Sequence, residues 1–216
     1  MGSPSEVIIP IFGILDVTGE VIAMWIIIAV VALIALIVTR NLKERPGVFQ
    51  NMVEAGVEYL DNYFSEAIGK KKARKYMFFL GSLFIFIIIA NYSGLVPGMG
   101  LTKYAKAPTS SLSVTLGLGI CAFLFLQIAG IAAGPAHYFK RFINPLMILD
   151  EIIKPFSLAL RLFGNVFGEE MVLENLYLIL PIGAPIIMMA LSILFCALQA
   201  RIFTMLVSIY LEESVG

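Results

Sequence analysis

The stretch from Val21 to Val38, VIAMWIIIAVVALIALIV, contains 18 consecutive residues without a charged side chain. An apolar run of this length is sufficient for a helix to cross the hydrocarbon core of a bilayer. The run therefore predicts a membrane-spanning helix at 21–38. Arg40, Lys43 and Arg45 follow it. By the positive-inside rule they place that end in the cytoplasm and the N-terminus outside.

The composition of the whole chain also indicates a membrane protein. Of its 216 residues, 60% are hydrophobic and 14% are charged, whereas a soluble domain has about 25% charged residues. The formal net charge is zero, so the charge balance gives no indication of nucleic-acid binding. The first 20 residues lack a basic start and contain three acids, which argues against a signal peptide. With no internal repeat, we expect one membrane domain over residues 1–216.

After Pro46 and Gly47 the pattern becomes amphipathic, which predicts a helix at 47–69. Apolar residues recur at helical spacing, and the opposite face carries Glu54, Glu58 and Asp61. Such a helix lies in the membrane interface rather than across it. Because its polar face is acidic, whereas lipid-binding helices are usually basic, we expect it to dock on protein as much as on lipid.

Four further membrane segments are predicted at 76–96, 112–133, 144–180 and 185–212. The last two would be about 50 Å and 40 Å long as helices, against a hydrocarbon core of about 30 Å. They must therefore tilt, kink or run partly along the interface. We expect an all-α integral membrane protein with about five membrane helices and one interfacial helix. The basic residues near the segment ends agree with this topology: Lys70, Lys71, Lys72, Arg74, Lys75, Lys140 and Arg141 inside, and only Lys103 and Lys106 outside.

Arg161 lies in the apolar surroundings SLALRLFGN, residues 157–165. Placing an arginine at the centre of a membrane helix costs about 2.5–3.5 kcal/mol on insertion scales. Such a side chain must face a wet cavity, an acid or another subunit. The alternative is a structural arginine that is ion-paired or reaches the interface. We favour a functional role, because other basic residues already mark the interfaces.

Three acids, Glu169, Glu170 and Glu174, follow Arg161 on the same predicted helix. Asn165 lies one turn after Arg161 on its face, whereas Glu170 is nearly opposite. Arg161 and Glu170 are therefore not expected to form a simple pair, and they can face two different aqueous spaces. The alternative is that some of these acids mark an exposed helix end.

The last predicted helix carries Gln199, with Ser192 two turns earlier on the same face, and a second arginine, Arg201. A buried glutamine needs a partner, and an arginine on an antiparallel neighbour would serve; ordinary interhelical hydrogen bonding is the alternative. His137 lies in a predicted cytoplasmic loop and is assigned no role. There is no phosphate-binding loop, metal-ligand spacing or nucleophile motif, so no enzymatic activity, cofactor or metal is expected.

The run Lys154–Asn165, KPFSLALRLFGN, resembles the signature of the a subunit of F-type ATP synthases. Three other stretches are similar to motifs of that family. NYSGLVP at 91–97 resembles N-x-x-G-L-x-P, PTSSLSVT at 108–115 resembles P-T-A-D-x-N-x-T, and QARIF at 199–203 resembles Q-A-x-I-F. The resemblance runs from about residue 21 to residue 213, with the order and spacing of the motifs preserved.

The resemblance implies an ion-translocating stator subunit of the F0 sector, whose last two helices form a tilted hairpin against the rotor ring. Arg161 then matches the essential arginine that faces the ring of c subunits, and Glu170 the acid of the outer half-channel. Gln199 matches the glutamine opposite the arginine, and Asn165 the polar residue one turn after it. Glu169, Glu174 and Ser192 are candidates for lining the path. The partners implied are the c ring, the b-subunit peripheral stalk, the soluble F1 ATPase and the lipid of a bacterial plasma membrane, with the C-terminus cytoplasmic.

The chain departs from the family pattern at several positions. Ser111 and Ser113 replace an acid and an amide, which puts the polar lining at the start of the fourth helix in doubt. Ser192 stands where some members have histidine, and Glu169 adds a second acid beside Glu170. The main competing hypothesis is a small secondary transporter with Arg161 binding an anionic substrate, but such folds usually show inverted repeats. A purely structural subunit is a second alternative. The sequence leaves open whether protons or sodium ions are carried.

Overall fold

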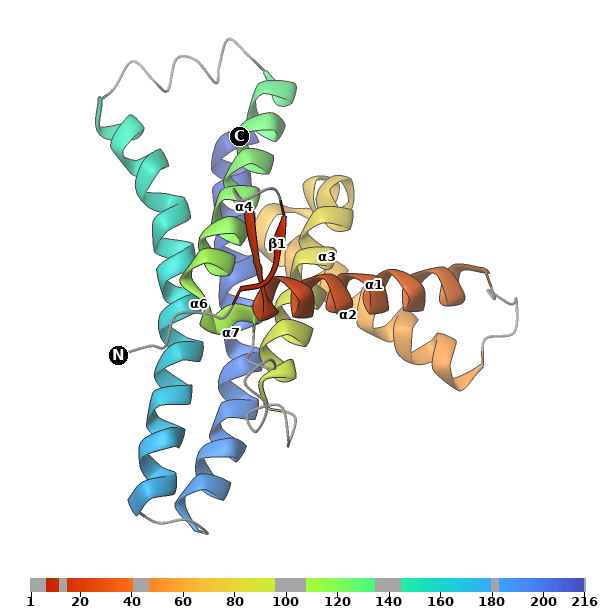
Figure 1. Cartoon of the computed structure of the whole chain (residues 1–216). Coiled ribbons are helices and arrows are strands. Elements are labelled where there is room, and N and C mark those ends of the chain that lie inside the picture. The colour runs from red at the N-terminus through yellow and green to blue at the C-terminus, as the bar shows by residue number, and fades with distance from the viewer. Residues whose placement is uncertain are drawn as a thin grey trace.

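The computed structural model describes residues 7–11, 15–40, 47–95, 108–134, 145–179 and 183–215 (Figure 1). Several basic residues used to predict the topology lie outside this part of the chain, as does His137: Lys43, Arg45, Lys103, Lys106, Lys140 and Arg141.

Helices account for nearly all of the described chain, and the expectation of an all-α membrane protein is confirmed. They are α1 (Gly19–Arg40), α2 (Val48–Ile68), α3 (Lys70–Ser93), α4 (Leu112–Ala133), α6 (Pro145–Ile179), α7 (Ala184–Val215) and a short 3-10 helix, η2 (Pro108–Ser110). The largest difference from the sequence-based bounds is at α3, which begins at Lys70 rather than Tyr76. The basic cluster therefore forms the first turns of this helix.

Two short strands, which the sequence did not predict, precede the first helix. β1 (Val7–Ile11) and β2 (Leu15–Thr18) pair as an antiparallel hairpin. A run of four or five residues carries too few alternations for a reliable period, so this hairpin was not separable from a loop. Because it ends directly before α1, the helical character of the membrane part is unaffected.

Four helices in the described chain are long and apolar enough to cross a membrane. The candidate spans are Val21–Arg40, Lys70–Ser93, Leu112–Ala133 and Ile186–Val215. The remaining long helix, α6, has 35 residues and carries more charges than a simple span. Its length corresponds to about 50 Å, which exceeds the hydrocarbon thickness.

The two longest helices, α6 and α7, run side by side in opposite directions, and α4 packs along α6 (Figure 1). Gly119 of α4 allows this close approach, because a Cβ there would lie 2.7 Å from the carbonyl oxygen of Pro155 in α6. In the same view α1, the most apolar span, lies across the long axes of α6 and α7. If α1 lies along the membrane normal, the axes of α6 and α7 are therefore strongly inclined to that normal.

The apolar core lies where α2, α3, α4, α6 and α7 meet. The second half of α2 joins it through Leu60, Phe64 and Ile68, whereas the first half is largely exposed. Gly69 connects α2 to α3 with a φ of 78°, a conformation that favours glycine.

Two tyrosines bind the backbone of α7 from neighbouring helices. The hydroxyl of Tyr63 in α2 donates to the carbonyl of Arg201 at 2.9 Å, and the hydroxyl of Tyr92 in α3 donates to the carbonyl of Ile193 at 2.9 Å. These bonds attach α7 to α2 near its junction with α3 and to the far end of α3.

Candidate functional site

Arg161 lies on α6 at the edge between its buried and exposed faces. The neighbouring Leu158 and Leu162 are buried in the core, whereas Leu160 and Arg161 itself are exposed. The guanidinium forms no hydrogen bond or ion pair with any described residue. The sequence hypothesis of an internally ion-paired structural arginine therefore finds no partner in this part of the chain.

The surface beside Arg161 is apolar and offers room for another molecule. Gly164, one turn later, is exposed, and a Cβ added there would meet nothing within 4 Å. Exposed apolar side chains occur along the length of α6: Leu149, Ile152, Ile153, Phe156, Leu160, Phe167 and Met171. An unpaired cation at the edge of such a surface is costly in lipid, and a partner carrying a negative charge would relieve that cost.

Glu169 points into the seam between α6 and α7. At about 100° per residue it lies on the same side of α6 as Leu158 and Leu162, which are fully buried. One of its carboxylate oxygens is buried without a hydrogen-bond partner, and so is the hydroxyl of Ser192 on α7. Ser192 is near enough to affect the Glu169 carboxyl electrostatically although no hydrogen bond joins them, and the charge of Glu169 also reaches Cys196. The structure thus brings together two of the residues singled out in the sequence.

Glu170 and Glu174 occupy different positions. Glu170 lies about 180° from Arg161 on α6, as the sequence predicts, and is half-buried with an interaction partner of its own. The side chain of Glu174 lies outside the described residues. Of the two acids whose side chains the structure describes, Glu169 is therefore the one directed into the seam.

Gln199 lies buried in the same seam, and its side-chain nitrogen has no hydrogen-bond partner. Two contacts define how α7 runs along α6: Glu213 meets Lys154 near one end, and Ser192 meets Glu169 near the other. Gln199 lies two thirds of the way from Glu213 to Ser192. This places it opposite the turn of α6 between Arg161 and Asn165, and Asn165 is half-buried.

Polar groups from α3 and η2 approach the same end of the seam as Ser192. Tyr92 binds the carbonyl of Ile193, and η2 packs against α6. Asn91 and Thr109 are buried, and both amide atoms of Asn91 and the hydroxyl of Thr109 lack hydrogen-bond partners. Both residues belong to the motifs at 91–97 and 108–115, but the sequence alone did not single them out as site residues. Ser111, in contrast, is half-buried and Ser113 is exposed.

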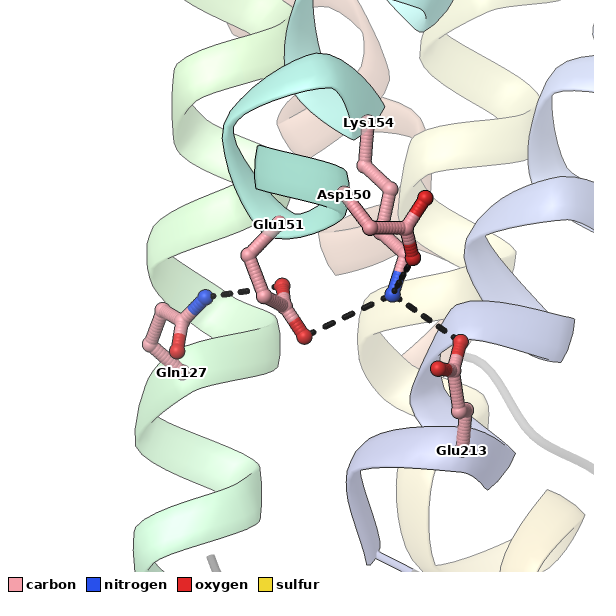
Figure 2. Close-up of polar contacts among 5 residues, drawn as sticks. All are labelled: Gln127, Asp150, Glu151, Lys154 and Glu213. Atoms are coloured by element: carbon pink, nitrogen blue, oxygen red, sulfur yellow. Dashed lines mark hydrogen bonds and ion pairs between the residues drawn. The ribbon is translucent and has the colours of Figure 1, made fainter. Parts of the chain in front are cut away.

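A cluster of charges around the buried Lys154 and Glu151 lies at the other end of the seam (Figure 2). The ammonium of Lys154 lies 3.2 Å from Asp150, 3.4 Å from Glu151 and 2.9 Å from Glu213, and Gln127 of α4 donates to Glu151 at 3.2 Å. Lys154 also lies 5.2 Å from the centre of the Tyr210 ring. Sequence reasoning missed this cluster, although acids three and four residues before Lys154 were an available signal.

Buried polar groups without partners are uncommon in folded proteins, and each one calls for water, an ion or a role in function. Five residues with such groups, Asn91, Thr109, Ser192, Glu169 and Gln199, lie along the seam toward Arg161, whereas two others, Ser65 and Tyr76, lie on α2 and α3. Among the described residues no group of three or more His, Cys, Asp or Glu side chains has the arrangement of a metal site.

Comparison with known proteins agrees with the sequence motifs. A family model described as ATP synthase A chain matches residues 21–212. A protein of Moorella thermoacetica (strain ATCC 39073 / JCM 9320), named ATP synthase subunit a, is 35% identical over 210 residues. The match covers 94% of this chain and 93% of that protein.

Proposed function

Because this chain belongs to the ATP synthase A chain family, we propose that it carries ions between the two sides of the membrane and the rotating c ring of the complex. In this proposal the α6–α7 seam forms two offset aqueous half-channels. Each ion enters through one, neutralises a carboxylate on the ring, travels with the ring through lipid and leaves through the other.

One observation carries the proposal: Arg161 is exposed at the edge of an apolar surface and has no acidic partner among the described residues. Arginine stays protonated at any physiological pH. A ring carboxylate that arrives opposite Arg161 therefore loses its ion, and the fixed positive charge prevents ions from crossing directly between the half-channels. Gly164 beside it leaves room for the ring helix to come close.

The outer half-channel follows the buried polar groups at Asn91, Thr109, Ser192 and Glu169. The loop ends of α3 and α4 lie on this side, which the sequence places outside the cell. The inner half-channel opens beside Lys154 and its three carboxylates, close to the basic start of α3, where Lys72 lies 4.0 Å from Glu212. This assignment keeps the N-terminus outside and the C-terminus in the cytoplasm of a bacterial cell.

The driving force is the ion gradient. Each elementary charge that crosses the membrane gains about 2.3 kcal/mol per 100 mV of membrane potential. Rotation of the ring delivers this energy to the soluble F1 ATPase, and the b-subunit stalk holds this chain still against F1. The protein itself then makes or breaks no covalent bond.

The experiment compares Arg161→Ala with Arg201→Gln in the complete complex reconstituted into vesicles. Arg161→Ala is expected to abolish ATP synthesis driven by an ion gradient, while the chain still inserts and assembles. The control, Arg201→Gln, removes the other arginine of these two helices, which lies on a side of α7 away from the seam. The Arg201→Gln complex is expected to retain ATP synthesis. Normal synthesis by the Arg161→Ala complex would contradict the proposal.

Vesicles that hold the isolated chain, without the ring or the soluble ATPase, separate this function from the transporter alternative. A secondary transporter would carry its substrate without the soluble ATPase or the ring. Uptake of small anions by the isolated chain, with no dependence on the c ring, would favour that alternative.

A further inference from the structure

Arg201 is a second arginine within an apolar helix, and the proposed ion path does not use it. It lies two residues after Gln199, on a different side of α7, and is exposed between the exposed side chains of Leu198 and Ile202. No carboxylate in the described chain pairs with it. A guanidinium in this setting requires a negative partner from outside the chain or contact with the membrane interface.

The immediate partner of Arg201 is Tyr63 of α2. The guanidinium carbon lies 5.1 Å from the centre of the Tyr63 ring, and Tyr63 stacks in turn on Tyr59 with ring centres 6.3 Å apart. The Tyr63 hydroxyl donates to the backbone carbonyl of Arg201 at 2.9 Å. The Tyr63 ring therefore lies against the guanidinium of Arg201, which has five N–H groups, and one tyrosine cannot engage all of them.

The rest of α2 indicates the depth in the bilayer at which Arg201 and Tyr63 lie. Val48, Phe49, Met52 and Tyr59 are exposed and fall on the same side of α2 as Tyr63, which forms a lipid-facing apolar stripe. Glu54, Glu58 and Asp61 fall on the opposite side. A helix with these two faces lies in the bilayer interface, where its stripe meets acyl chains and its ends reach headgroups.

We infer that Arg201, held by Tyr63 at the end of this stripe, binds the phosphate of an anionic phospholipid. The guanidinium edge matches the geometry of a phosphate group, and the exposed Leu198 and Ile202 supply contacts for the acyl chains. A carboxylate on another protein subunit is the competing partner. The apolar surroundings favour the lipid, because a protein partner at this position would have to enter the acyl-chain side of α2. Glu66, one turn after Tyr63, is exposed and does not pair with Arg201.

The proposal can be tested in the intact complex with a photoreactive amino acid. One version carries it at Leu198, one turn before Arg201, and a control version carries it at Ile193, which is exposed on the same helix nearer its other end. Each complex is placed in nanodiscs with equal amounts of phosphatidylglycerol and phosphatidylcholine. After illumination, mass spectrometry identifies what each probe has captured.

We expect the Leu198 probe to capture phosphatidylglycerol about fivefold more often than phosphatidylcholine, the preference that one interfacial arginine supplies. The Ile193 probe should show no such preference. Arg201→Gln should abolish the preference at Leu198 while keeping the backbone bond to Tyr63. Arg74→Gln, which removes an exposed charge from α3, should leave it unchanged.

Two outcomes would overturn the inference. Equal capture of both lipids at Leu198 would show that Arg201 selects no headgroup. Capture of another subunit of the complex at Leu198, in place of lipid, would identify a protein carboxylate as the partner. Neither outcome bears on ATP synthesis, so failure of this inference leaves the proposed function intact.

Discussion

Lys154 on α6 and Glu213 near the end of α7 form an ion pair at 2.9 Å, although 59 positions separate them in the chain. With Asp150 and Glu151 on the same lysine, this pair fixes the end of the seam that we assign to the inner half-channel. The side chains of this cluster differ in exposure. Lys154 is 5% exposed and Glu151 8%, whereas Glu213 is 43% exposed.

Lys154→Met is therefore expected to destabilise the chain by about 3 kcal/mol, because it leaves the buried Glu151 without its cation. Glu213→Gln should cost less than about 1 kcal/mol, since this carboxylate is partly solvated and the lysine keeps two other acids. Reversible unfolding in mixed micelles, followed by circular dichroism, measures both. Adding Glu151→Leu to Lys154→Met should recover part of the lost stability. If it does not, the loss in Lys154→Met does not come from the Glu151 carboxylate.

Gly119 and Gly164 should respond in opposite ways to larger side chains. Gly119→Ala meets the Pro155 carbonyl and should cost about 1–3 kcal/mol of stability. At Gly164 an added Cβ meets no described atom within 4 Å, so Gly164→Leu should cost little stability, but the larger side chain should obstruct the ring and stop ATP synthesis. An active Gly164→Leu complex would contradict a close approach of the ring at this point.

The contributions of Glu169 and Glu170 to ion passage can be distinguished by measuring passive proton flux through membranes stripped of the soluble ATPase. Glu169→Gln should lower the flux at least about tenfold, because it removes a proton-accepting group from the seam itself. Glu170→Gln should also slow ion passage without uncoupling, but to a smaller extent. Flux through Glu169→Gln membranes equal to that of the unmodified complex would remove Glu169 from the path.

Tyr63 makes the attachment of α2 to α7 sensitive to alkaline pH. Burial raises the pKa of the Tyr63 phenol above its ordinary value of 10.0, and the nearby Arg201 opposes this only in part. Since the folded pKa is higher than the unfolded one, the contribution of Tyr63 to stability is complete below pH 10 and is lost as the pH rises through the folded pKa. Hydrogen exchange of the second half of α2 should therefore accelerate above about pH 10. In Tyr63→Phe, hydrogen exchange of this segment should already be faster at neutral pH. It should then show no additional acceleration above about pH 10 that comes from ionisation of a phenol.

Much of the fold could be predicted from the sequence, because apolar runs and the basic residues beside them report directly on membrane helices. The predicted start of one segment at residue 112 is also the first residue of α4 in the structure. α3 begins before the predicted span at 76–96, because the basic residues that precede the apolar run continue the helix and lysine is a good helix former. The hairpin of β1 and β2 was missed for lack of a measurable period.

The site was less accessible from sequence, because it depends on how two helices face each other. The helical period placed Glu170 opposite Arg161, but it could not show that Glu169 meets Ser192 across the seam. The Lys154 cluster depends on Glu213, whose partner a single sequence does not reveal. Asn91 and Thr109 looked like ordinary motif positions until their burial without partners was visible.

The bonds from Tyr63 and Tyr92 to α7 end on main-chain oxygens, at Arg201 and Ile193. Every residue except proline at either position offers the same acceptor without affecting the preceding turn. Related chains are therefore free to change the side chains at these two positions while keeping both attachments, provided that the tyrosines remain. A search for pairs of positions that vary together would consequently overlook two of the contacts that orient this helix.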